Sequence, residues 1–272
     1  MRWAFCWGTA VVSVVLLSTV CVDLSSAQLD RLRSARSAES HQVAETPMVE
    51  VSSGEFMMGR DGSEALADER PLHAVWLEEF TIDLHEVTTA QYARFLTSTG
   101  HQAPWQWETV DLTQHGDRPV VGVSWYDADA YCRWKEKRLP TEAQWEKAAK
   151  GTDGRRYPWG NQAPTKDHAN FALGARFSYN QVLLPVKSLE QGVSPYGLHH
   201  MAGNAYEWVQ DWYLTNYYES SPSKNPQGPE QGQFKVLRGG SWSDLAKYLL
   251  TYSRFKLPPD TRNSYTGFRC AR

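Results

Sequence analysis

The 272-residue chain is poor in cysteine, has no excess of positive charge and lacks the familiar catalytic signatures. Its 4 cysteines are too few for a disulfide-stapled scaffold of this length. The 28 basic and 31 acidic side chains give a formal charge of −3, which argues against a nucleic-acid partner because such domains carry a basic excess on one face. There is no Gly-x-Ser-x-Gly elbow, phosphate-binding loop, His-Glu-x-x-His or Gly-x-Gly-x-x-Gly motif. By contrast, 12 tryptophans, 19 glycines and 14 prolines are typical of a loop-rich domain whose rings fill the gaps between irregular segments.

The clearest apolar run lies at the N-terminus. Arg2 precedes the apolar stretch from Ala10 to Val22, and Ser25-Ser26-Ala27 supplies the small residues of a cleavage site. The run is shorter than the roughly 20 residues that cross a bilayer. We therefore predict a signal peptide over residues 1–27, removed on export to the periplasm or the medium, with no membrane span afterwards; the alternative is an uncleaved anchor. Residues 28–46 are polar and charged, and we expect them to form a flexible linker.

Export would also decide the state of the cysteines. Cleavage after residue 27 removes Cys6 and Cys21 and leaves Cys132 and Cys270. In an oxidising compartment two surviving cysteines are expected to pair, and the alternative is a couple of buried thiols.

From residue 47 onward the pattern predicts an α+β domain that runs to residue 272. Helices are expected to begin after Thr88, Ser124 and Thr141, because each can cap a helix and is followed by an amphipathic stretch. Runs of apolar residues between turn signals predict the strands. These lie at Met48–Val51, Glu55–Met58, His73–Leu77, Phe80–Asp83, Phe234–Leu237 and around Gly267–Cys270, with a long loop-like region between Gly151 and Val209.

Two segments stand out as possible metal sites. Gly203 to Trp208 combines a glycine turn with Glu207, a mixture of carbonyl and carboxylate oxygens that suits calcium. The alternative is a plain turn that leads into a strand anchored by Trp208. His199 and His200 are adjacent, and adjacent side chains diverge on a helix or strand, so we do not expect both to chelate one transition metal.

Ordered motifs run through the whole domain. They are Glu86-Val87-Thr88, Pro119–Trp125, Arg138–Glu146, Tyr157–Asn161, Tyr196-Gly197-Leu198, Gly203–Trp208, Arg238–Trp242 and Gly267-Phe268-Arg269. Together they resemble the formylglycine-generating enzyme, or sulfatase-modifying factor, family. The resemblance covers essentially all of residues 47–272 and implies a loop-rich α+β fold related distantly to the C-type lectin fold.

The resemblance also implies structural calcium. The ligands map onto Asn170 and the Phe171 carbonyl at one site, and onto the Gly203 and Ala205 carbonyls and Glu207 at the other. The remaining ligands of the first site fall within residues 177–181. At the second site, His200 stands where an Asn or Asp ligand is usual.

The active site that the resemblance implies is where the chain departs from the enzymes. Formylglycine generators of the family bind copper(I) through two cysteines shortly after Gly-Gly-Ser, and copper(I) requires soft thiolates. Residues 241–250 contain no cysteine, and Asp244 occupies about the position of the first. Cys132 and Cys270 match the cysteines of the family's structural disulfide. We therefore expect no copper and no copper-dependent formylglycine generation.

These observations predict an exported maturation or accessory protein that binds a peptide, a protein or a small molecule. A family relative in periplasmic pyoverdine maturation offers an analogy. The residues expected to line the binding groove are Trp242, Asp244, Tyr248 and Arg254. One alternative is an enzyme of different chemistry in the same place, with Asp244 as a base or as a ligand of a harder metal. Another is a lectin-like recognition domain, as in retroelement-diversified binding proteins whose C-terminal region is similar.

Overall fold

A computed structural model of the chain describes residues 44–173 and 179–272, and for residues 179 and 180 only the backbone. The predicted signal peptide and the linker up to residue 43 lie outside the described residues. The chain divides into residues 1–44 and 45–272, and every element below belongs to the second unit. No helix in the described part of the chain is long and apolar enough to cross a membrane.

The four strands predicted in the N-terminal part are present, and they form two antiparallel ribbons. Strand β1 (Met48–Val51) pairs with β4 (Phe80–Asp83), and β2 (Gly54–Met58) pairs with β3 (His73–Leu77). Strand β2 begins one residue earlier than expected because Gly54 already pairs with Leu77. Alternate residues of β2 and β3 are buried, so each strand turns one face to the core.

The three predicted helices are confirmed, and each begins with a capping box. Thr88, Ser124 and Thr141 accept a hydrogen bond from the backbone amide three residues later, whose own side chain reaches back to the cap. The helices are α2 (Thr89–Thr99), α4 (Trp125–Trp134) and α5 (Glu142–Lys150), with shorter turns at α3 (Leu112–His115) and α6 (Tyr179–Val182).

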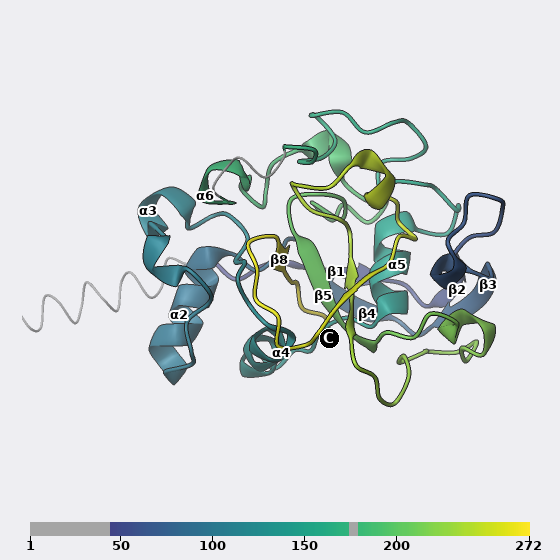
Figure 1. The fold of residues 1–272 in the computed structure, drawn as a ribbon, viewed down its shortest axis with the longest axis horizontal. Coiled ribbons are helices and arrows are strands. Elements are labelled where there is room, and N and C mark those ends of the chain that lie inside the picture. The colour runs from purple at the N-terminus through teal and green to yellow at the C-terminus, as the bar shows by residue number, and fades with distance from the viewer. Residues whose placement is uncertain (1–43, 174–178) are drawn as a thin grey trace, which may run out of the picture. The chain divides into compact units, whose positions relative to one another are not determined.

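A four-stranded sheet, in the order β7-β6-β5-β8, forms the C-terminal part of the fold. Two of its strands, β5 and β8, are labelled in Figure 1. Its strands are β5 (Tyr206–Trp212), β6 (Lys235–Arg238), β7 (Phe255–Leu257) and β8 (Thr266–Gly267). The sequence prediction was wrong at its edges: β5 begins inside the expected loop, β6 starts one residue late and β7 was not expected.

The last predicted strand is also shorter than expected. Strand β8 ends at Gly267 because the following backbone turns away from the sheet toward β4. The Phe268 carbonyl accepts from the Val87 amide, and the Cys270 carbonyl accepts from the Asp83 amide. Residues 268–270 therefore fasten the C-terminus to the N-terminal ribbons.

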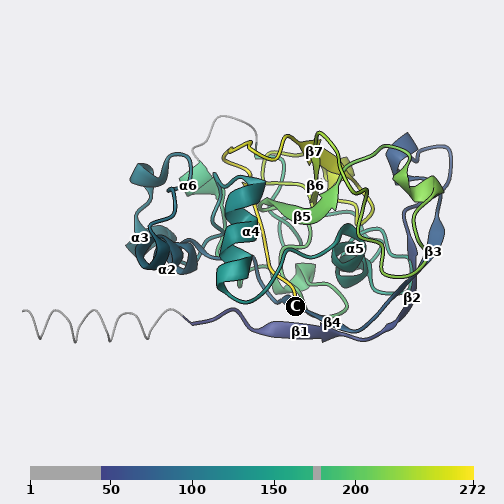
Figure 2. The ribbon, with the colours of Figure 1, turned by 90° about the horizontal axis from the view of Figure 1, so that it is seen from below.

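Helix α5 packs between the β2–β3 ribbon and strands β5 and β6 of the sheet (Figure 2). Every one of its residues is buried, although four of them are charged. Glu142 pairs with Arg254 at 2.7 Å, and Glu146 pairs with Arg238 at 2.6 Å. Because a buried charge is costly unless it is paired, these ion pairs allow a polar helix to occupy the centre of the fold.

A disulfide joins Cys132 of α4 to Cys270, as expected. Both residues are fully buried in a second core that includes the rings of Tyr92, Tyr131 and Phe268. The bridge ties the C-terminal segment to helix α4.

Candidate functional site

The segment that follows β6 is a tight turn. Gly240 has a φ of +74°, and a Cβ atom there would lie 2.7 Å from a methyl carbon of Leu249 and 3.0 Å from the Tyr248 carbonyl oxygen. Only glycine fits this combination of a left-handed backbone and close packing. The absence of a side chain at Gly240 therefore lets the turn pack directly against residues 248 and 249.

Asp244 closes this turn. Its Oδ2 accepts from the Ser241 amide at 3.0 Å and from the Ser241 hydroxyl, and its Oδ1 accepts from the Tyr206 hydroxyl at 3.3 Å. Burial raises the pKa of Tyr206, and the nearby Asp244 charge raises it further. Both oxygens of Asp244 thus have local partners, which commits the carboxylate to holding the turn in shape.

Trp242, expected in the groove, belongs to the core. Its side chain is 4% exposed and packs with Val121, Leu183 and Ala205. Its Nε1 donates to the Ser264 carbonyl at 3.2 Å. The indole therefore anchors the turn to the core and is too buried to contact a ligand.

Arg254 lies deep beside α5. Its Nε and Nη2 donate to the two oxygens of Glu142 at 2.7 and 2.9 Å, and its guanidinium lies 4.9 and 4.4 Å from the ring centres of Tyr213 and Tyr218. Burial acts to lower the pKa of Arg254, but the Glu142 carboxylate outweighs it and raises that pKa. Arg254 therefore stabilises the fold through its ion pair with Glu142, and part of its side chain also lines the pocket described next.

Tyr248 and Arg254 line a pocket of about 330 Å³, here called the Tyr248 pocket. Roughly 300–1,000 Å³ is usual for a small-molecule site, so its size is sufficient for a small ligand. Of the predicted groove residues, the structure brings Tyr248 and Arg254 together here, while Trp242 and Asp244 are not among the lining residues. The lining residues are Arg60, Glu64, Leu66, Glu69, Arg156, Lys247, Tyr248, Leu250, Ser253 and Arg254.

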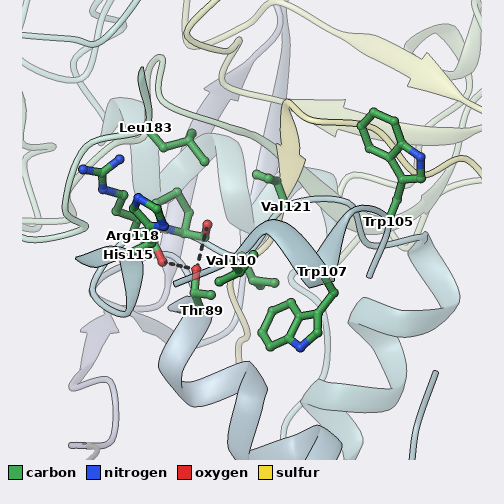
Figure 3. Close-up of a pocket in the computed structure, with 10 residues that line it drawn as sticks. Thr89, Trp105, Trp107, Val110, His115, Arg118, Val121 and Leu183 are labelled. Atoms are coloured by element: carbon green, nitrogen blue, oxygen red, sulfur yellow. Dashed lines mark hydrogen bonds between the residues drawn. The ribbon is translucent and has the colours of Figure 1, made fainter. Parts of the chain in front are cut away.

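A second hollow lies beside the start of α2 and the segment that joins α2 to α3. Its lining includes Thr89, Trp105, Trp107 and Leu183 (Figure 3). The Thr89 hydroxyl already donates a hydrogen bond to the Arg118 carbonyl at 3.0 Å. The hollow encloses about 10 Å³, which is room for about one water molecule. We therefore place the candidate ligand site in the Tyr248 pocket.

The residues of the second expected calcium site lie in the core. Glu207 is fully buried, and its two oxygens accept from Arg269 Nε and Nη2, each at 2.8 Å. Trp145 Nε1 donates to the same carboxylate at 2.8 Å. Since the guanidinium already neutralises Glu207, this carboxylate does not fit a calcium ligand as placed. The turn at Gly203 and Ala205 leads directly into β5, as in the alternative interpretation.

The expected first calcium site is only partly within the described residues, because residues 174–178 are not described. Asn170 Nδ2 donates to the Val182 carbonyl at 2.8 Å and to Asn204 Oδ1 at 3.0 Å. Phe171 packs beside a buried aromatic cluster. Across residues 44–173 and 179–272, no group of three or more His, Cys, Asp or Glu side chains is placed to hold a metal ion. Calcium binding stays a prediction.

The adjacent histidines diverge, as expected. The ring centres of His199 and His200 are 6.4 Å apart, and His199 packs 4.9 Å from His85. Burial lowers the pKa of both His85 and His200 to about 3, so these two rings are neutral at ordinary pH. His200 Nε2 donates to the Pro185 carbonyl at 3.1 Å. The cluster is therefore a packed core feature.

The pocket residues that the sequence did not indicate come from three separate parts of the chain. Arg60 and Glu64 follow β2, Arg156 follows α5, and Lys247 follows the glycine turn. No spacing in the sequence links them. A signal existed only for Lys247 and its neighbour Tyr248, which lie in the segment where the resemblance places the enzymes' cysteines.

Comparisons with known proteins agree with this architecture. The model of the sulfatase-modifying factor enzyme 1-like domain (FGE-sulfatase) matches residues 34–272. The formylglycine-generating enzyme of Streptomyces coelicolor is 36% identical over 283 aligned residues, which cover 82% of this chain and 88% of that enzyme. The structure of PvdO from Pseudomonas aeruginosa superposes with a TM-score of 0.70 at 26% identity, covering 83% of this chain and 93% of PvdO.

Another relative has a different name. The serine/threonine-protein kinase pkn1 of Chlamydia caviae is 39% identical over 246 residues, which cover 84% of this chain and 38% of the kinase. The chain thus spans well under half of that relative, and the likeness concerns this domain rather than the kinase as a whole. On the domain match and the likeness to formylglycine-generating enzymes, the chain belongs to the sulfatase-modifying factor (FGE-sulfatase) family.

Proposed function

We propose that this chain is an exported maturation or accessory protein that binds a ligand and does not generate formylglycine by the copper-dependent route. The observation that carries the proposal is the state of its cysteines. Residues 241–250, where the family resemblance places the copper ligands, contain none. Cys132 and Cys270 are joined to each other and fully buried. Cys6 and Cys21 lie in the predicted signal peptide.

The chemistry explains why this matters. Copper(I) is a soft ion that is held by thiolates, and a cysteine in a disulfide has no thiolate to offer. Asp244, at about the position of the first copper ligand, is a hard oxygen donor whose two oxygens accept hydrogen bonds from Ser241 and Tyr206. The mature chain therefore has no thiolate pair with which to activate oxygen in the way of the enzymes.

What the chain retains is a place to bind. The Tyr248 pocket lies beside the turn that replaces the cysteine segment, and it combines an exposed ring with charged side chains. Recognition of a peptide, a protein or a small molecule there requires no reacting group.

The test is mass spectrometry on a Cys-x-Pro-x-Arg peptide incubated with the purified mature protein, copper(I), oxygen and a reductant. We expect the peptide mass to stay unchanged, while the Streptomyces coelicolor formylglycine-generating enzyme in a parallel reaction serves as the positive control. A mass loss that matches thiol-to-aldehyde conversion would overturn the proposal.

Export has its own test. The intact mass of the protein recovered from the periplasm or the medium should correspond to a chain that begins at Gln28 and contains one disulfide. A chain that stays in the cell with residues 1–27 attached would contradict this part of the proposal.

A further inference from the structure

The rim of the Tyr248 pocket carries unbalanced positive charge. Two of its cations are already neutralised, because Arg254 pairs with Glu142 and Arg60 Nε pairs with Glu69 at 2.8 Å. The remaining cations are Arg156 and Lys247, and both are exposed.

Neither of these two cations has a carboxylate partner among the described residues. Lys247 places its ammonium 4.9 Å from the ring centre of Tyr248, and the Arg156 backbone, not its guanidinium, bonds to Asn161 and Thr251. One exposed carboxylate, Glu64, shares the lining. Two unpaired cations against one unpaired carboxylate leave a net positive rim, and such a rim favours an anionic group.

Part of the pocket wall is apolar, formed by Leu66, Tyr248 and Leu250. Tyr248 is 38% exposed and Leu66 is 56% exposed, while Leu250 forms a buried part of the lining. Large exposed apolar side chains beside a pocket are typical of ligand sites, which combine an apolar surface with a few orienting polar groups.

The inner side chains of the pocket, Arg60 and Glu69, are held in place by hydrogen bonds. Arg60 donates to Glu69, to the Tyr252 hydroxyl at 3.3 Å and to the Glu64 carbonyl. Glu69 in turn accepts from the Leu66 amide at 2.9 Å. Because these inner groups satisfy one another, the free charges of the pocket are those at its rim.

We propose that the Tyr248 pocket binds a small organic carboxylate whose apolar part packs on Tyr248 and Leu66 and whose anionic group lies between Arg156 and Lys247. This inference rests on the proposed function, since it names the class of ligand that an accessory protein of this family would hold. The volume of about 330 Å³ suits an acid of amino-acid size rather than a folded partner.

The test compares two probes of equal shape and different charge. N-acetylphenylalaninate carries a carboxylate, and N-acetylphenylalaninamide does not. Each is titrated into the isotope-labelled full-length mature protein and followed by the amide shifts of Tyr248 and Ser253. We expect the acid to bind about two- to fivefold more tightly than the amide, which is the usual effect of an exposed ion pair, and to lose this advantage at high salt.

Three variants are expected to change the preference for the acid over the amide in opposite directions. Arg156→Gln and Lys247→Gln should each reduce the preference for the acid, whereas Glu64→Gln should increase it. Lys224→Gln is the matched control, because Lys224 is exposed, pairs with Glu78 at 3.1 Å and does not line the pocket. All four residues are exposed, so folding is expected to stay intact, and opposite effects from rim substitutions cannot come from a general loss of structure.

Equal binding of acid and amide, or no binding of either, would overturn the inference. An acid preference that persists unchanged in both Arg156→Gln and Lys247→Gln would also overturn it. These failures are distinct from failure of the proposed function, which is decided by the mass of the Cys-x-Pro-x-Arg peptide.

Discussion

The disulfide between Cys132 and Cys270 gives the most quantitative prediction. It joins residues 138 apart in the sequence. In the chain-entropy model, closing a loop of 138 residues stabilises the folded state by about 5 kcal/mol, because the unfolded chain loses conformational freedom. Reduction of the bond should remove this contribution. The expected loss is a large part of the total stability of an ordinary domain, about 5–15 kcal/mol.

The assay is urea unfolding of the oxidised and reduced protein, followed by tryptophan fluorescence. With a denaturant slope of about 2–3 kcal/mol/M, a loss of about 5 kcal/mol lowers the midpoint by about 2 M. Alkylation followed by intact mass confirms how many thiols each sample contains. The double variant Cys132→Ala/Cys270→Ala should be at least as unstable as the reduced protein, because it also loses buried sulfur atoms.

A midpoint that moves by less than about 0.5 M on full reduction would refute the reasoning. It would mean that the unfolded chain gains little freedom when the bond opens. Agreement between reduced wild-type protein and the double variant, with both far below the oxidised protein, would support it.

The remaining predictions concern buried charge and the glycine turn. Glu142→Gln leaves the Arg254 guanidinium buried without its carboxylate partner, and should lower the free energy of unfolding by about 3–5 kcal/mol in urea titration. Burial, reinforced by Glu142, raises the pKa of Asp211 to about 7, so the folded protein holds a proton that the unfolded chain has released above about pH 4. Stability should therefore fall as pH rises from about 4 to about 7, and Asp211→Asn should raise the thermal midpoint at pH 8 more than at pH 5. Gly240→Ala should cost more than about 1 kcal/mol in the same titration, since its Cβ would meet Leu249 in a left-handed backbone; a neutral result would contradict the packing of the turn.

Local rules predicted the elements with strong end signals. The helices after Thr88, Ser124 and Thr141 were predictable because a cap and its partner three residues later act within one turn of chain. The strands were less so, since strand pairing depends on distant segments. Phe255–Leu257 became a strand because β6 lies beside it, and its own sequence carries no strong alternation.

The candidate site was predicted only in part, for a similar reason. Proximity to Gly-Gly-Ser suggested Trp242, but the indole turns inward and donates to Ser264. Sequence neighbourhood indicated the correct segment but not the direction of each side chain. Arg60 and Arg156 reach the pocket through the packing of loops that nothing in their local sequence relates.

The charged helix α5 also constrains the order in which the protein can be built. Its carboxylates meet their guanidinium partners 92 residues later for Glu146 and 112 residues later for Glu142. Packing the ribbons and the sheet around α5 without those arginines would leave Glu142 buried without its guanidinium partners, at a cost of several kcal/mol, and would leave Glu146 with Lys150, at 2.7 Å, as its remaining cation partner. We therefore expect the core around α5 to close only once the segment that carries Arg238 and Arg254 is in place.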